Sequence, residues 1–396
     1  MLRSHLRPML GRDPAEDERA GSGLEIFYDL VFVVAFSVAG VQLADYLAEG
    51  KVETAVMGYL LATFASLWAW INFAWFASAF DTDDWLYRIL TMVQMVGVAI
   101  IAIGIPDVFT SIEHHEHVDL VVVIIGYMVM RVGMIAQWLR AALQAPAYRR
   151  SALTYAGMTT LAQIGWVVVA IVPTGLWATL AAILVCMAVE LLGPAIAELR
   201  VGRTPWHPGH IAERYATLMV ITLGEGVVGT VVVLQSLIAR TGWSAETIVL
   251  GLTAMGVTFA MWWLYFLLPS GQVLGSRPEK CFGFGYASMP LYMACAAVGG
   301  GLHVIALWVE HEVHISDGAV LACLAVPLAV FTLGLIAMHA YLSGYRRPER
   351  LMTVAAVLPI PAAALALAAG APLPAAVVVV CLTPVLPVVV AEVCTV

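Results

Sequence analysis

Long apolar stretches, separated by short polar segments, run through the whole chain. Each stretch is close to the ~20 residues that an α-helix needs to cross the hydrocarbon core of a bilayer. The pattern predicts an all-α, polytopic transmembrane helical bundle of about twelve spans, or roughly ten if the last two, rich in Ala, Val and Pro, are incomplete. The expected spans are 25–47, 53–79, 88–109, 118–141, 151–173, 175–198, 209–237, 245–268, 282–308, 317–343, 351–370 and 373–394.

Charged residues are scarce, and their positions orient the spans. Only 12% of the residues are charged, against about 25% in soluble proteins, so hydrocarbon must solvate most of the surface. If the N-terminus is cytoplasmic, Lys and Arg in the polar segments lie on the inner side, except Lys51 and Arg240, while Arg131 lies inside the fourth span. Cytoplasmic segments carry an excess of Lys and Arg, so we expect both ends of the chain in the cytoplasm.

Two similar segments indicate an internal repeat. Residues 133–139 (GMIAQWL) resemble residues 334–342 (GLIAMHAYL), and an Arg-Arg pair follows each. Six spans per half would give both halves the same orientation, as in the parallel repeats of some transporters. We therefore expect a cytoplasmic N-terminal segment, 1–24, followed by two six-helix halves, 25–200 and 201–396.

Two carboxylates open the first span. Glu25 and Asp29 are four residues apart, so they share one helix face, and two like charges there need a proton or a cation between them. They are candidates for a binding or translocation site at the cytoplasmic mouth. Alternatively, Glu25 complements the positive end of the helix dipole.

The seventh span opens with further titratable groups. His210 and Arg214 lie one turn apart, Glu213 lies between them, and Glu225 should lie about 16 Å deeper than Arg214 at 1.5 Å per residue. Charges at such depth are costly and mark functional groups by default. For Glu225 two interpretations stay open: a structural ion pair with Arg131, or a proton relay.

An acidic segment joins the second and third spans. Asp81, Asp83 and Asp84 are followed by Arg88, and neighbouring carboxylates can keep one Asp protonated as a general acid. An enzyme acting on an isoprenoid or lipid could use Asp83 or Asp84 in this way, with Arg88 holding an anionic head group. Alternatively, the segment is a solvated loop that caps the third span.

Two outer loops are rich in histidine, and imidazoles suit divalent transition metals. They contain His114, His115, His117, His311 and His314. No cofactor other than such a metal is expected. The six cysteines form no C-x-x-C pair, so we expect neither a disulfide framework nor a cysteine metal site. No basic tract indicates a nucleic-acid partner.

Several motifs resemble, in order, those of the low temperature requirement A (LtrA) family of bacterial membrane proteins. They are EIFYDLVFV at 25–33, WINFAWFASAFDTDD at 70–84, PWHPGHIAERY at 205–215 and ITLGEG at 221–226. The family's last motif commonly reads L-G-E-S, whereas Gly226 follows Glu225 here. The resemblance implies a multi-pass protein of the bacterial inner membrane associated with growth at low temperature.

These observations favour a proton- or cation-coupled secondary transporter, with the lipid bilayer as its surroundings and a small molecule, ion or lipid as its substrate. The alternatives are a membrane-embedded enzyme on a lipid or isoprenoid substrate, and a non-catalytic stress sensor or adaptor. Paired carboxylates, His210 and Glu225 would carry the protons or the cation of a transporter. Asp83 or Asp84 would be the acid of an enzyme, and the outer histidine loops would be the metal or pH sensors of an adaptor.

Overall fold

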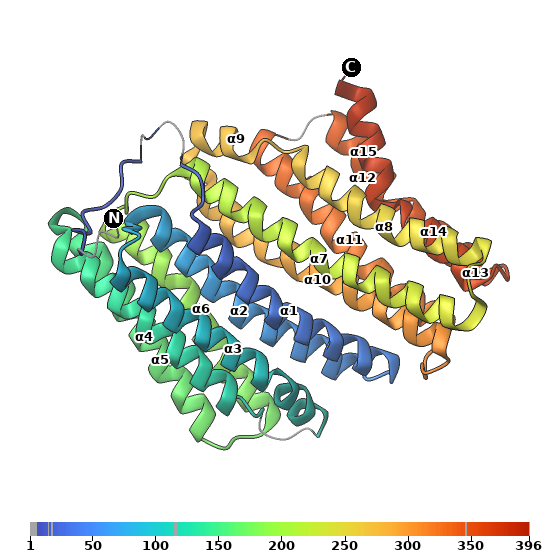
Figure 1. Cartoon of the computed structure of the whole chain (residues 1–396), viewed down its shortest axis with the longest axis horizontal. Coiled ribbons are helices and arrows are strands. Elements are labelled where there is room, and N and C mark those ends of the chain that lie inside the picture. Colours follow the sequence, from blue (N-terminus) through green and yellow to red (C-terminus); the bar gives the residue numbers. More distant parts are fainter. Residues whose placement is uncertain (1–5, 15, 17–18, 115–117, 345–346, 396) are drawn as a thin grey trace. The chain divides into compact units, whose positions relative to one another are not determined.

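The computed structural model describes residues 6–14, 16, 19–114, 118–344 and 347–395. The described residues are mostly helical and contain no strand (Figure 1). The main helices are α1 (Gly23–Ala48), α2 (Val52–Phe80), α3 (Trp85–Glu113), α4 (Val121–Gln144), α5 (Arg149–Ile171), α6 (Leu176–Ile196), α7 (Pro208–Thr241), α8 (Ala245–Phe266), α9 (Ser270–Ser276), α10 (Cys281–Glu310), α11 (Asp317–Ser343), α12 (Arg347–Val357), α13 (Pro359–Ala368), α14 (Leu373–Val380) and α15 (Leu382–Thr395); η1 (Pro146–Tyr148), η2 (Ala197–Val201) and η3 (Pro278–Lys280) are short extra turns.

Twelve helical segments within the described residues are long and apolar enough to cross a membrane, which confirms the expected number. The last two, Pro348–Ala368 and Leu373–Cys394, are each built from two consecutive helices. Proline has no N–H and cannot donate to the carbonyl four residues earlier. Pro359 begins α13, and Pro384 lies in the first turn of α15, so each break lies where a helical hydrogen bond is missing.

Polar side chains cap several helices at their first turn. The carboxylate of Asp84 accepts from the backbone N–H of Tyr87 at the start of α3, and Ser244 does the same for Thr247 at the start of α8. Ser22 and Glu25 form a reciprocal capping box before α1: the N–H of Ser22 donates to Glu25 at 2.7 Å, and that of Glu25 to Ser22 at 3.3 Å. Such caps satisfy N–H groups that lack a partner within the helix.

The chain divides into two compact units. The first contains 1–39 and 60–215, and the second 40–59 and 216–396. These limits differ from the expected halves, because part of α1, part of α2 and the first turns of α7 group with the opposite half. The internal repeat itself stays a prediction.

Glycines set close helix packing within the first unit. A Cβ on Gly97 of α3 would lie 2.5 Å from the carbonyl oxygen of Gly126, and one on Gly126 of α4 would lie 2.6 Å from that of Gly97. Small residues at crossing points let membrane helices approach closely and gain van der Waals contact. The first unit therefore has a tight crossing between α3 and α4, which Figure 1 shows side by side.

The second unit uses the same device. A Cβ on Gly299 of α10 would lie 2.7 Å from the carbonyl oxygen of Glu225, and one on Gly229 of α7 would lie 2.9 Å from that of Gly299. Likewise, a Cβ on Gly301 would meet the carbonyl oxygen of Cys323 on α11 at 2.6 Å. α10 is therefore packed between α7 and α11 along backbones that a larger side chain would separate.

The segment before α1 lies over the ends of α2 and α4 in the first unit. The N–H of Arg12 donates to the carbonyl of Ala79 at 2.8 Å, and the N–H of Met9 donates to the side chain of Gln144 at 2.8 Å. Arg19 is buried and donates to the carbonyls of Ala77 and Ser78. A cation at a helix C-terminus interacts favourably with the dipole, so Arg19 holds this segment against the end of α2.

Candidate functional site

Four titratable side chains from α1 and α7 form a buried group, here called the α1–α7 cluster, in the first unit. Glu25 and Asp29 lie one turn apart on α1, and His210 and Arg214 one turn apart on α7. Each of the four is exposed by 1% or less. Removing a charge from water costs several kcal/mol unless it is paired, so the pairing inside this cluster determines what it can do.

Asp29 and Arg214 form the inner pair. Nη2 of Arg214 donates to Oδ1 of Asp29 at 2.5 Å, and the indole N–H of Trp70 on α2 donates to the same oxygen at 2.6 Å. Within the described residues, Oδ2 of Asp29 and both Nε and Nη1 of Arg214 have no hydrogen-bond partner. Two nitrogen atoms of Arg214 and one oxygen of Asp29 are therefore available for further hydrogen bonds.

Glu25 and His210 form the second pair, here called the outer pair because it is closer to the first residues of α1 and α7. Nε2 of His210 lies 3.2 Å from Oε1 of Glu25, and Nε of Arg214 lies 4.0 Å from the same oxygen. Glu25 also belongs to the capping box with Ser22. Glu25 therefore fits both interpretations that the sequence left open, because the same side chain caps α1 and lies in the buried cluster.

The charges of the four side chains of the α1–α7 cluster do not balance among themselves, and the buried Arg19, which acts electrostatically on Glu25 and His210, lies beside Asp81. Two carboxylates carry two negative charges and Arg214 carries one positive charge, so a neutral His210 leaves a net charge of minus one. A proton on His210 or on a carboxylate makes the sum zero. Because a net charge in apolar surroundings is expensive, the cluster has a physical reason to hold one proton.

Aromatic rings line the cluster on the α2 side. The rings of Trp70 and Tyr215 meet edge to face with centroids 5.0 Å apart, and the guanidinium of Arg214 lies 5.8 Å from the centre of Trp70. The indole N–H of Trp75 donates to the hydroxyl of Tyr215 at 3.3 Å. Trp70 was not assigned to a site from the sequence. Because an indole N–H inside a span needs a hydrogen-bond acceptor, Trp70 could have been expected to lie beside a polar side chain.

Glu213 lies outside this cluster. Its side chain is on the exposed side of α7 and accepts from the backbone N–H of Gly21 at 3.2 Å. It thus ties the segment before α1 to α7. Although its neighbour Arg214 is buried, Glu213 is not part of the buried charge balance.

Arg131 pairs with Glu190 of α6, a residue that the sequence analysis did not single out. Nη2 of Arg131 donates to Glu190 at 2.9 Å and to the hydroxyl of Tyr127 at 2.5 Å. The indole N–H of Trp68 donates to the same carboxylate at 2.8 Å. The signal was a carboxylate in the middle of an apolar run. This pair is balanced, so Arg131 does not need Glu225 to neutralise its charge.

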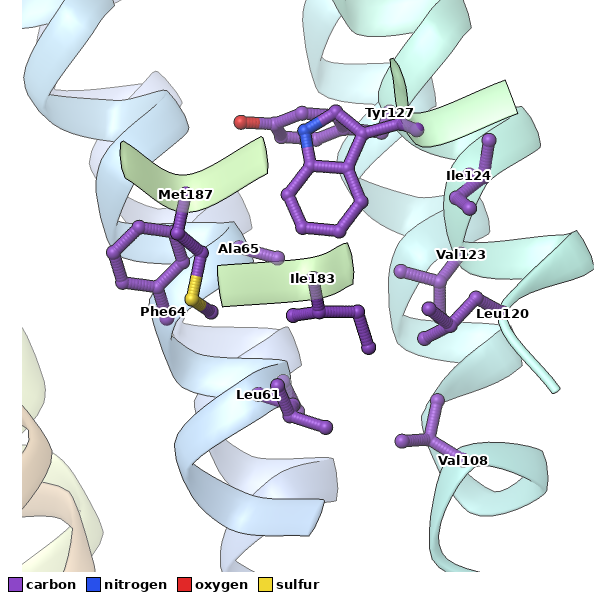
Figure 2. A pocket seen from close by; sticks show the side chains of 12 residues that line it. Leu61, Phe64, Ala65, Val108, Leu120, Val123, Ile124, Tyr127, Ile183 and Met187 are labelled. Carbon is purple, nitrogen blue, oxygen red and sulfur yellow. The ribbon is translucent and has the colours of Figure 1, made fainter. Parts of the chain in front are cut away.

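An apolar cavity of about 30 Å³ lies beside this pair. Figure 2 shows side chains from α2, α4 and α6 around it, among them Leu61, Ile124 and Ile183. The ring of Tyr127 forms part of its wall, and the hydroxyl donates to Glu190 at 3.2 Å. Apolar walls offer an ion no ligands, so this cavity is not part of a polar site in the first unit.

Glu225 lies in the second unit, on a part of α7 that is continuous. Its charge is within electrostatic range of Tyr59 and Cys295. A Cβ on Gly226 would lie 2.6 Å from Oγ1 of Thr258, so glycine at this position admits Thr258 of α8 against α7. The glycines after Glu225 therefore serve close approach rather than a break in the helix.

The acidic segment places its carboxylates in three different environments. Asp84 caps α3 and is paired with Arg140 of α4, whose Nη1 donates to Oδ1 at 3.0 Å and whose Nη2 donates to Oδ2. Burial opposes ionisation of Asp84, but hydrogen bonds from Arg140, Tyr87 and Arg7 outweigh it and lower its pKa to about 2. Asp84 is thus held as an anion at the start of α3, which does not favour the role of general acid.

Asp83 is exposed and has a left-handed backbone, with φ of 46°. Its two oxygens accept from Nε and Nη2 of Arg88, both at 2.9 Å. Each of these residues is therefore occupied by the other at the surface, and neither the acid nor the anion-binding role suggested for an isoprenoid enzyme gains support from the geometry.

Asp81 is the partly buried member of the acidic segment, with a side chain exposed by 10%. One oxygen accepts from the N–H of Asp83 at 2.8 Å, and the other lies 3.9 Å from Nη2 of Arg19. Burial, and next the charge of Glu25, raise the pKa of Asp81 to about 6. Of the two acidic residues of this segment with shifted pKa values, Asp81 is therefore the one that can exchange a proton closer to neutral pH.

The histidines of the outer loops are not brought together by the structure where it describes them. His114, His311 and His314 are exposed, and His115 and His117 lie outside the described residues. Within the described residues no group of three His, Cys, Asp or Glu side chains could hold a metal ion. The metal site stays a prediction.

Comparisons with known proteins identify the family. The family model described as bacterial low temperature requirement A protein (LtrA) matches residues 20–385. An uncharacterized protein of Rhizobium meliloti (strain 1021) is 27% identical over 266 residues, which are 63% of this chain and 59% of that protein. No solved structure matches. Since the family model covers nearly the whole chain, including every residue of the α1–α7 cluster, this protein belongs to the LtrA family of multi-pass membrane proteins.

Proposed function

We propose that this protein is a proton-coupled secondary transporter of the bacterial inner membrane, with both chain ends in the cytoplasm, and that the α1–α7 cluster is its coupling site. The observation that carries the proposal is the buried group of two carboxylates, one arginine and one histidine. Intramembrane titratable groups commonly belong to proton relays. The substrate that moves with the proton is a small molecule, ion or lipid.

The charge balance gives this site a coupling mechanism. With one proton bound, the cluster is neutral and α1 can stay packed against α7. When the proton leaves, the net charge of minus one must be solvated, which favours a conformation that admits water. A ligand shifts an equilibrium between two conformations only when it binds one of them more tightly. Here the proton binds more tightly to the conformation in which α1 is packed against α7.

Arrangement of the neighbouring groups supports the proposal. His210 lies on the outer side of the cluster in contact with Glu25, whereas Asp29 is held by Arg214 and Trp70. His210 and Glu25 are therefore the proton carriers, and the inner pair fixes the charge that the proton balances. The Arg131–Glu190 pair is already neutral and serves packing.

A pH jump tests the proposal without knowledge of the substrate. Liposomes containing the protein are adsorbed to a solid-supported membrane, and the charge displaced by the jump is recorded. The wild type should give a transient current, and Glu25→Gln should remove most of it because the variant cluster is neutral without a proton. Glu213→Gln, which alters an exposed carboxylate on the same helix, is the matched control and should keep the current.

A sodium jump at constant pH completes the experiment. We expect no current from it, since Arg214 already occupies the centre of the cluster and a metal cation would meet a guanidinium there. A sodium current without a proton current would identify a metal cation as the coupling ion. Equal proton currents from the wild type and Glu25→Gln would overturn the assignment of the site.

A further inference from the structure

We propose that Asp81 passes protons between an aqueous pocket on the cytoplasmic side and the Glu25–His210 pair. The inference rests on the proposed function, because it adds the way by which the α1–α7 cluster exchanges protons with water. It concerns the first unit alone, where Asp81 follows the last residue of α2.

The pocket is formed by the segment before α1 and by the acidic segment. Its volume is about 310 Å³, and residues 7–12 and 80–83 line it. The side chain of Asp81 lies in its wall and is exposed by 10%. Water in the pocket can therefore reach this carboxylate, although most of the side chain is buried.

Asp81 interacts with Arg19 and, electrostatically, with Glu25 of the cluster. Arg19 approaches one carboxylate oxygen at 3.9 Å and is fixed by the carbonyls of Ala77 and Ser78. Glu25 is the charged residue with the strongest effect on Asp81. The charged and titratable groups that face Asp81 are Arg12 and Arg19 from the segment before α1, Glu25 from α1, Asp83 from the same loop, and Tyr87 and Arg88 from α3.

Asp81 differs from its two acidic neighbours in what occupies its oxygens. Both oxygens of Asp83 accept from Arg88, and both oxygens of Asp84 accept from Arg140. Asp81 has one oxygen in a backbone hydrogen bond and the other at a longer distance from a guanidinium. A proton can therefore be added to Asp81 without breaking a bidentate ion pair.

Electrostatic coupling with Glu25 links the protonation of Asp81 to that of the Glu25–His210 pair. Burial and the negative charge of Glu25 raise the pKa of Asp81 to about 6, so Asp81 takes up a proton more readily while Glu25 is ionised. When the Glu25–His210 pair gains the proton, the repulsion falls and Asp81 releases protons more easily. Such coupling is reciprocal, and the balanced step is movement of one proton from pocket water to Asp81 and onward to the pair.

The rate of the pH-jump current tests this proposal. Asp81→Asn keeps an oxygen that can accept from the N–H of Asp83, so the loop can fold as before. We expect the total displaced charge to be retained and its rate of rise to fall about a hundredfold, the lower end of the contribution that a positioned proton-transfer group makes. Asp83→Asn, two residues away and exposed, is the matched control and should keep the wild-type rate.

A pH profile separates proton transfer from a structural role. In the wild type the rate should change around pH 6, the pKa of Asp81, and this change should disappear in Asp81→Asn and return in Asp81→Glu. A wild-type rate and profile in Asp81→Asn would overturn the proposal while leaving the coupling site standing. Loss of the proposed function has a different signature, namely unchanged displaced charge in Glu25→Gln.

Discussion

Arg214 donates from Nη2 to Oδ1 of Asp29 at 2.5 Å, and neither side chain is exposed by more than 1%. The two residues come from α7 and α1, so this contact joins helices that are far apart in sequence. It also fixes the only guanidinium of the α1–α7 cluster within the described residues. Everything proposed for the cluster depends on the charge that remains after this pair is formed.

Replacement of Arg214 should therefore be severely destabilising. Arg214→Gln leaves two buried carboxylates without their guanidinium, and breaking a buried pair costs about 3 to 5 kcal/mol. The free energy of unfolding in bicelles, measured by SDS titration, should fall by that amount. Adding Asp29→Asn should recover a large part of the loss, whereas equal stability of the single and double variants would show that the two side chains do not interact.

The Arg131–Glu190 pair predicts a second coupling of the same kind. Glu190→Gln leaves Arg131 charged and unpaired and should lower the unfolding free energy by about 3 kcal/mol. Replacing both, as Arg131→Met with Glu190→Gln, should restore much of it, because Gln can still accept from Trp68. Glu213→Gln, which alters an exposed carboxylate of the same unit, is the comparison variant, and no such recovery should appear when it is combined with Arg131→Met.

Features that depend on residues close together in the sequence could be predicted, whereas contacts between distant residues could not. The spans follow from hydropathy, and the caps follow from local motifs such as Ser22 with Glu25. Glu25, Asp29, His210 and Arg214 were singled out because charges in apolar stretches are costly. Their pairing was not predictable, since it depends on which helices pack together. For the same reason Glu190 was not foreseen as the partner of Arg131, and an ion pair of Arg131 with Glu225 was one of two interpretations left open.

Stability should depend on pH through Asp81. Its pKa is about 6 in the folded protein and 3.8 as an ordinary Asp, so between these values the folded state binds more protons than the unfolded state. The unfolding free energy therefore falls as pH rises through this window. The loss is about 3 kcal/mol for roughly two pKa units at about 1.4 kcal/mol each.

Asp81→Asn should remove this dependence. Unfolding of the wild type and of the variant is compared at pH values on both sides of the window. The variant should be the more stable of the two above pH 6, with little difference near pH 4. A variant that is less stable at neutral pH would show that ionised Asp81 is held by favourable partners.

Close packing of α3 on α4 gives a steric prediction. Gly97→Ala places a Cβ 2.5 Å from the carbonyl oxygen of Gly126, so the backbones must separate, at a cost of about 1 to 3 kcal/mol. Gly157→Ala on α5 is the matched control, because nothing lies within 4 Å of its Cβ position. Equal unfolding midpoints for the two variants would show that the crossing is looser than described.

The central claim is that the net charge of the α1–α7 cluster, and not one hydrogen bond, makes it bind a proton. The most direct test is the charge displaced by a pH jump in Asp29→Asn, measured against Glu213→Gln. Within the described residues no hydrogen bond joins Asp29 to His210. Neutralising Asp29 nevertheless leaves one negative charge on Glu25 and one positive charge on Arg214. We predict that the displaced charge is lost in Asp29→Asn and retained in Glu213→Gln, and a full displaced charge in Asp29→Asn would contradict the account.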